Sequence, residues 1–156
     1  MVESGFYDLN VCYLPESSDR VEELAAIAKH LGYSGIALTY PDSSKNMSFP
    51  GNLAGIEVFS GVEVRIQKAS KLHSIVEKYR SKVGVITVCG GNEGINRAAV
   101  ENPKVDILTH MNMGQESGFN HVLAKAANEN KVAICFDLGD LIRLRGGSRV
   151  HALSNF

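Results

Sequence analysis

The glycine-rich stretch that follows Cys89 has the residue types of a phosphate-binding turn. Gly90 and Gly91 let the backbone turn sharply at no steric cost. Asn92 comes next and can cap the short helix that we expect to follow it. Arg97 then lies on the first or second turn of this helix, and the planar fork of a guanidinium grips phosphate well. The stretch therefore indicates an anionic partner.

Arginines also follow the ends of other predicted strands. They are Arg65 at the end of the third strand, Arg97 after the fourth, and Arg143, Arg145 and Arg149 after the sixth. In a fold of parallel βα units, the loops after the strands share one side of the molecule, so we expect these side chains to form one basic surface. Such a surface binds phosphates in a salt-dependent way. We expect Arg97 to contribute most, because the glycine turn can hold its helix close to a ligand.

The elements that position these residues alternate between strands and helices. The clearest helix is predicted over residues 19–31, where apolar side chains recur at helical spacing behind an aspartate-led capping box. Further helices are predicted over residues 69–79, 94–101 and 117–129. Strands are predicted over residues 6–12, 34–40, 56–66, 83–88, 105–109 and 132–137. Residues 41–55 are expected to form a loop, and Gly61 a bulge or kink in the third strand.

This alternation predicts an α/β fold of parallel βα units. Residues 83–88 and 132–136 are apolar at nearly every position, as in a parallel strand that is covered on both faces. A doubly wound sheet and a (β/α) barrel both fit the pattern. A complete eight-stranded barrel typically needs about 250 residues, so 156 residues would make only part of one. The length favours a single domain over residues 1–156.

Composition narrows the choice of partners and compartment. The formal net charge is −1 at pH 7, so a nucleic-acid site would have to be a local basic patch. We see no apolar run long enough to span a membrane and no signal peptide at the N-terminus, which predicts an intracellular protein. The three cysteines are far apart, so we expect free buried thiols rather than disulfides or a zinc site.

The strand ends offer few ligands for a catalytic metal. Asp8 and Asn10 alternate on the first predicted strand and could hold one hard cation, with His110 as the one histidine at a strand end. A metal-dependent hydrolase would need several such ligands converging. We therefore expect no tightly bound metal, but a metal-dependent phosphoesterase on a βα scaffold stays open as an alternative. The nucleophile motif G-x-S-x-G and the dinucleotide fingerprint G-x-G-x-x-G are both absent.

Four stretches carry a resemblance to a known family, and they cover residues 6–11, 61–65, 90–108 and 117–127. Together with Arg149, they resemble the ribonuclease P protein component 3 family of archaea, the thirty-kilodalton subunit. The resemblance implies a partial TIM-like barrel, lacking the last βα units, that is related to the polymerase and histidinol phosphatase superfamily. The metal-dependent members of that superfamily open with a His-x-His pair, and this chain has Asp8 and Asn10 there.

The resemblance also implies a function. It implies a protein subunit of ribonuclease P, which supports the RNA-catalysed removal of the 5′ leader from precursor tRNA in the cytoplasm. The catalytic centre would belong to the RNA and use magnesium, and the isolated protein would be non-catalytic and hold no cofactor. The implied partners are ribonuclease P RNA, a small ferredoxin-like protein subunit, other holoenzyme proteins, and precursor tRNA as substrate.

Overall fold

The structure, a computed structural model, describes residues 5–13, 19–41, 51–111, 118–136 and 142. The chain divides into two compact units. The first unit comprises Met1–Glu63 and Tyr79–Ile86, and the second comprises Val64–Lys78 and Thr87–Phe156. The prediction of a single domain stays a prediction.

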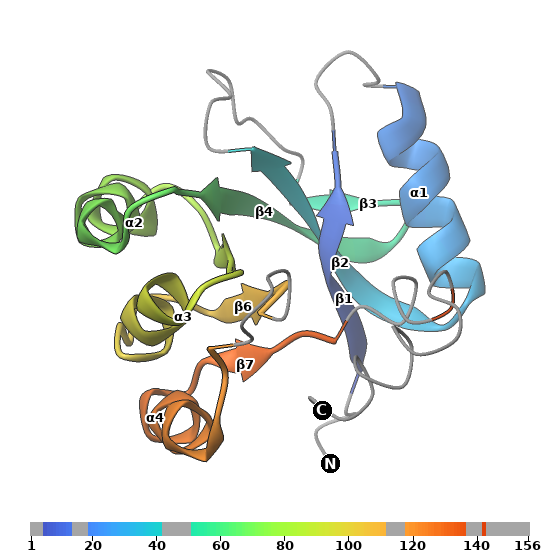
Figure 1. The fold of residues 1–156 in the computed structure, drawn as a ribbon. Helices are drawn as coiled ribbons and strands as arrows, with labels where there is room; N and C mark the ends of the chain where they lie inside the picture. The colour runs from blue at the N-terminus through green and yellow to red at the C-terminus, as the bar shows by residue number, and fades with distance from the viewer. Residues whose placement is uncertain (1–4, 14–18, 42–50, 112–117, 137–141, 143–156) are drawn as a thin grey trace. The chain divides into compact units, whose positions relative to one another are not determined.

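The first unit is built on three parallel strands. Its elements are β1 (Phe6–Cys12), α1 (Asp19–His30), β2 (Tyr33–Pro41), β3 (Asn52–Leu53) and most of β4 (Ile56–Arg65). Strands β1 and β4 each pair in parallel with β2. Helix α1 packs against β2 (Figure 1). The side chains of Ala25 on α1 and of Ile36 and Leu38 on β2 are almost fully buried in the resulting core. The predicted helix and strands of this region are confirmed.

The prediction that residues 41–55 form a loop is wrong for the last residues of this range. Asn52 and Leu53 form β3, which runs antiparallel to β4. Ala54 and Gly55 make the tight turn between the two strands, and both have positive φ angles, of 52° and 79°. Glycine tolerates that conformation, but alanine does not favour it, so only one of the two turn residues is of the type that predicts a hairpin.

The bulge predicted at Gly61 is also wrong. The register between β2 and β4 is continuous from Gly35 to Pro41, and Gly61 lies opposite Thr39 within it. A Cβ atom at Gly61 would come within 2.7 Å of the Thr39 hydroxyl oxygen. Glycine therefore serves close packing between neighbouring strands here rather than a break in the strand.

The second unit has three further parallel strands and a row of helices. Its elements are η2 (Ala69–Lys71), most of α2 (Leu72–Arg80), the end of β5 (Val85–Cys89), α3 (Glu93–Val100), β6 (Ile107–Thr109), α4 (His121–Asn130) and β7 (Ala133–Ile134). Strand β6 pairs in parallel with β5 and with β7. Helix α3 contacts η2, α4 and β6, and α4 contacts β7, so the helices line up along one side of the strands (Figure 1). The predicted parallel βα units are thus confirmed in both units.

Several boundaries in the second unit differ from the predictions, among them the start of α4 and the end of β7. Helix α4 begins at His121, because the Asn120 side chain accepts hydrogen bonds from the N–H groups of Val122 and Leu123. The predicted start at Ser117 is therefore wrong, although Ser117 itself lies outside the described residues. Strand β7 is only two residues long, shorter than the predicted 132–137. Asparagine and serine both cap helices well, so the sequence alone does not choose between them.

Candidate nucleic-acid interface

The glycine turn before α3 is held together by a buried asparagine. The Asn96 side chain is fully buried, and its Oδ1 accepts a hydrogen bond from the Gly91 N–H at 3.2 Å. Its Nδ2 donates to the backbone oxygen of Met111 at 3.0 Å. A Cβ atom at Gly90 would collide with Asn96 Oδ1, so only glycine fits there. Asn96 therefore joins the loop after β5 to the loop after β6, a structural role that the sequence analysis missed.

The predicted cap at the start of α3 is confirmed. The Asn92 side chain accepts a hydrogen bond from the Ile95 N–H at 3.0 Å, with Asn92 in an extended conformation. Gly91 has a φ angle of 132°, which a residue with a side chain rarely adopts. The turn thus has the conformation that its residue types predict. Its glycines serve the packing around Asn96 and the entry into the helix.

Arg97 lies between two carboxylates on the outer side of α3. Its guanidinium is 2.9 Å from Glu93 Oε1 and 3.5 Å from Glu101 Oε1, each four residues away. The hydrogen bond to Glu93 and the charges of Glu93 and Glu101 raise the pKa of Arg97 further above its usual range. The Arg97 side chain is still 43% exposed, so a ligand can reach it. A phosphate would nevertheless have to compete with two carboxylates, which the sequence analysis did not take into account.

Arg65 opens a basic segment at the start of the second unit. It is the last residue of β4 and is exposed. Lys68 follows directly before η2 and Lys71 ends η2, and both are exposed. The sequence has no acidic residue between Glu63 and Glu77. The helical pattern predicted over residues 69–79 does not by itself mark either lysine as part of a site. The long interval without an acidic residue was the available signal.

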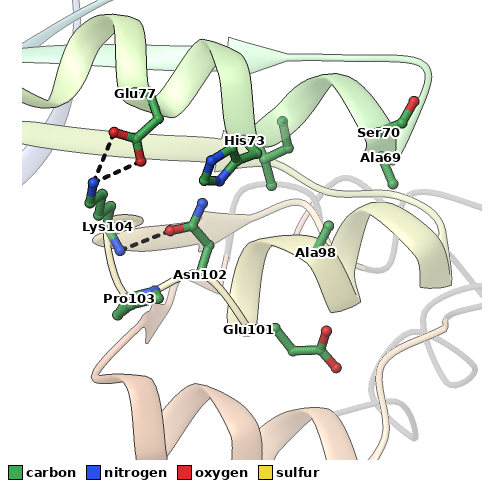
Figure 2. A pocket seen from close by; sticks show the side chains of 10 residues that line it. Ala69, Ser70, His73, Glu77, Ala98, Glu101, Asn102, Pro103 and Lys104 are labelled. Atoms are coloured by element: carbon green, nitrogen blue, oxygen red, sulfur yellow. Dashed lines mark hydrogen bonds and ion pairs between the residues drawn. The ribbon is translucent and has the colours of Figure 1, made fainter.

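A shallow groove of about 420 Å³ lies beside this segment, between η2 with α2 and the end of α3 (Figure 2). Ala69, Leu72 and Ala98 contribute apolar surface to it, and His73 and Asn102 contribute polar side chains. The remaining lining residues are Ser70, Glu77, Glu101, Pro103 and Lys104. The groove therefore combines apolar walls with polar and charged groups from three elements.

An ion pair closes one end of the groove. Lys104 Nζ lies 2.7 Å and 2.8 Å from the two carboxylate oxygens of Glu77. The hydrogen bond from Lys104, together with the charges of Lys104 and His73, lowers the pKa of Glu77. Asn102 Oδ1 accepts a hydrogen bond from the Lys104 N–H at 3.0 Å, which fixes the amide group at the same end. Figure 2 shows both interactions as dashed lines.

The structure describes two of the five arginines that are predicted to bind RNA. Arg65 and Arg97 both belong to the second unit, and Arg97 lies on a helix that contacts η2. Arg143, Arg145 and Arg149 lie outside the described residues. That all of these arginines share one surface therefore stays a prediction.

The strand ends show no complete metal site within either unit of the described chain. In the first unit, Asp8 Oδ1 accepts a hydrogen bond from the Asn10 N–H at 3.1 Å. In the second unit, the ligating atoms of Cys89 and His110 lie within 4.8 Å of each other. All three cysteines are free as predicted, but Cys12 is exposed and the other two are half-buried, so the prediction that they are buried is wrong.

The residues of this chain match a known family almost throughout. A family model described as RNase P subunit p30 matches residues 5–156. The chain belongs to this family. It is 51% identical over 156 residues to a ribonuclease P protein component 3 of Methanococcoides burtonii, covering 100% of this chain and 65% of that protein. It is 48% identical to the protein of the same name in Methanosarcina mazei, covering 99% of this chain and 66% of that protein. The chain thus spans about two thirds of the length of these relatives.

A solved structure has the same fold. A chain in a cryo-EM structure of archaeal ribonuclease P with mature tRNA matches 96% of this chain with a TM-score of 0.69 and 28% sequence identity. This chain covers 65% of that one. The match confirms the predicted fold class, parallel βα units of a partial TIM-like barrel. Among the residues that the structure describes, no helix has the length and apolarity that crossing a bilayer requires.

Proposed function

We propose that this chain is a protein subunit of ribonuclease P and supports the RNA-catalysed removal of the 5′ leader from precursor tRNA. The observation that carries the proposal is the match to the p30 family over residues 5–156. The likeness to a chain of archaeal ribonuclease P with mature tRNA supports it at the level of the fold. The activity is a property of the whole particle, and we assign this chain a part in it.

The protein itself would perform no chemistry and hold no cofactor. The reaction would take place on the RNA with magnesium, and the protein would support the active fold of that RNA. The proposal draws on the first strand, where this chain has Asp8 and Asn10 in place of the His-x-His pair that opens the metal-dependent members of the superfamily. Hydrolysis of a generic phosphodiester by the isolated chain with added divalent metal would instead support a phosphoesterase.

The proposed partners are ribonuclease P RNA, a small ferredoxin-like protein subunit, the other holoenzyme proteins, and precursor tRNA as substrate, all in the cytoplasm. Contacts to RNA phosphate would come from Arg65, Arg97, Arg143, Arg145 and Arg149. Among these residues, Arg97 is paired with Glu93 and Glu101, so an RNA phosphate would have to compete with two carboxylates for it.

Reconstitution tests the proposal directly. Ribonuclease P RNA and the partner subunits are assembled with and without this chain, and the cleavage of precursor tRNA is measured at low magnesium. We expect the chain to raise the cleavage rate, with a product that begins at the mature 5′ end. Equal rates with and without the chain, in a particle that has demonstrably incorporated it, would contradict the proposal.

A further inference from the structure

We propose that the basic segment Arg65–Lys71 and the groove beside it form a binding site for an unpaired RNA nucleotide. Its phosphates would lie on Lys68 and Lys71, and its base would enter the groove. The inference rests on the proposed function, since it takes RNA to be the partner. It goes further by naming the protein residues that bind the RNA and by specifying that the bound RNA is unpaired.

The phosphate half of the site rests on charge and spacing. Lys68 and Lys71 flank η2, and the Lys71 N–H donates to the Lys68 backbone oxygen at 3.1 Å, so the two residues are one turn apart. Side chains three residues apart in a 3₁₀ turn lie on the same side of it. Both lysines are exposed, and the nearest acidic residues in the sequence are Glu63 and Glu77. Two cations on one side of a turn suit successive phosphates of one strand.

The base half of the site rests on the lining of the groove. A nucleobase has two apolar faces and a polar edge, and proteins bind unpaired bases by stacking them on aromatic side chains, histidine included. Here Ala69 and Ala98 supply apolar surface above the buried Leu72, and the exposed His73 supplies a ring. Figure 2 shows the His73 and Asn102 side chains on facing sides of the groove.

Asn102 can contribute to recognition of the base edge. Its Oδ1 accepts the Lys104 N–H, which orients the amide and directs its Nδ2 to other acceptors. An amide donor fits the acceptor atoms on a base edge. The groove therefore offers a stacking surface and an oriented donor within one compact unit.

The carboxylates of the groove do not oppose an RNA strand strongly. Glu77 is paired with Lys104, and Glu101 lies 3.5 Å from Arg97. Glu77 lies with Lys104 at the end of the groove away from Ala69 and Ser70 of η2, and Glu101 lies along its lower edge in the view of Figure 2. The phosphates, which carry the negative charge of the ligand, are assigned to the opposite, basic end. A double helix keeps its bases stacked and presents none to the groove, so the site should prefer unpaired RNA.

Binding of two RNA probes tests the site in the full chain. The probes are a twelve-nucleotide oligoadenylate and a duplex of the same length, and the affinity for each is measured at several salt concentrations. Lys68→Gln with Lys71→Gln should lower the salt slope for the single strand by about 1.4, or about 0.7 for each lost phosphate contact. Ala98→Leu fills the groove and should weaken binding of the single strand about tenfold without changing the slope or the duplex affinity.

Matched variants on α4 serve as controls. Lys125→Gln removes an exposed lysine that lies 3.9 Å from Glu129, and Ala124→Leu enlarges an exposed alanine. Neither should change the single-strand affinity. The inference would be overturned if Ala98→Leu left that affinity unchanged, if it weakened duplex binding equally, or if the lysine variant kept the full slope. Wild-type binding to ribonuclease P RNA, measured alongside, shows separately whether the proposed function holds.

Discussion

The loop before α3 and the segment before α2 both follow strand ends, yet their residues have different roles. In the first, Asn92 caps the helix, Asn96 is buried between two loops, and Arg97 is paired with two carboxylates. In the second, Lys68 and Lys71 are exposed in a stretch without acidic residues. The difference shows that a motif rich in chemically suggestive residues can be mainly structural, while a plainer basic stretch presents the exposed cations that we propose as the phosphate site.

Replacement of Asn96 should reveal the structural role of the α3 region most strongly. Asn96→Ala removes both hydrogen bonds of the buried side chain and leaves the Met111 oxygen and the Gly91 N–H without that partner. We expect the free energy of unfolding to fall by about 3 kcal/mol in chemical denaturation. Asn128→Ala, at an exposed position on α4, is the control, and Lys68→Gln with Lys71→Gln should also keep full stability. If Asn96→Ala leaves the free energy of unfolding almost unchanged, the structural role assigned to the α3 region is contradicted.

The packing of Gly118 against α3 should have the next largest effect. A Cβ atom there would collide with the backbone of Glu93 at the start of α3. Gly118→Ala should lower the free energy of unfolding by about 2 kcal/mol, the usual scale for overpacking. Gly51→Ala is a suitable control, because a Cβ atom at Gly51 meets nothing within 4 Å. Equal stability of the two variants would show that α3 can shift to accommodate the new methyl group.

Removing the charges of the two carboxylates beside Arg97 tests whether this arginine can bind RNA phosphate. Glu93→Gln with Glu101→Gln removes both charges that neutralise this arginine. If α3 faces RNA, the affinity for ribonuclease P RNA should rise several-fold and the salt slope should increase by about one, because Arg97 can then pair with phosphate. Glu129→Gln on α4 is the matched control. An unchanged slope in the folded double variant would mean that α3 faces away from the RNA.

The smallest predicted effect concerns the ion pair at the end of the groove. Lys104 and His73 lower the pKa of Glu77 below its ordinary value of 4.5, so the folded protein holds this carboxylate in its charged form. The pair therefore contributes stability above about pH 4.5, and this contribution is lost as the pH falls through the lowered pKa. The Tm of Glu77→Gln should lie slightly below that of the wild type at pH 7 and equal it in strong acid. A gap that widens in acid would contradict the assigned sign.

Much of the fold follows from local patterns in the sequence. Val21, Ala25 and Ala28 recur at helical spacing and are all buried on α1, and β2 and β5 are apolar runs that are buried nearly throughout. Such patterns reflect burial of one helix face or of both strand faces, and they can be read without a tertiary context. The family resemblance also rested on contiguous stretches of sequence, and the comparisons confirm it.

The features that the sequence did not reveal depend on neighbours distant in the chain. Gly61 reads as a bulge, but its reason is the approach of Thr39 on the adjacent strand. Asn96 reads as an ordinary helix residue, but its partner Met111 lies fifteen positions away. Arg97 reads as a phosphate contact behind a glycine turn, but Glu93 and Glu101 lie at the four-residue spacing that forms ion pairs on a helix. That last pattern was available in the sequence.

The salt dependence of binding to ribonuclease P RNA tests most directly whether Lys68 and Lys71, rather than Arg97, bind phosphate. Wild type, Lys68→Gln with Lys71→Gln, and Arg97→Ala are compared by the slope of log affinity against log salt concentration, after each has been shown to be folded. We expect the lysine variant to lower the slope by about 1.4 or more and Arg97→Ala to change it by clearly less. If the slope instead falls by about one or more for Arg97→Ala and stays unchanged for the lysine variant, this expectation is contradicted.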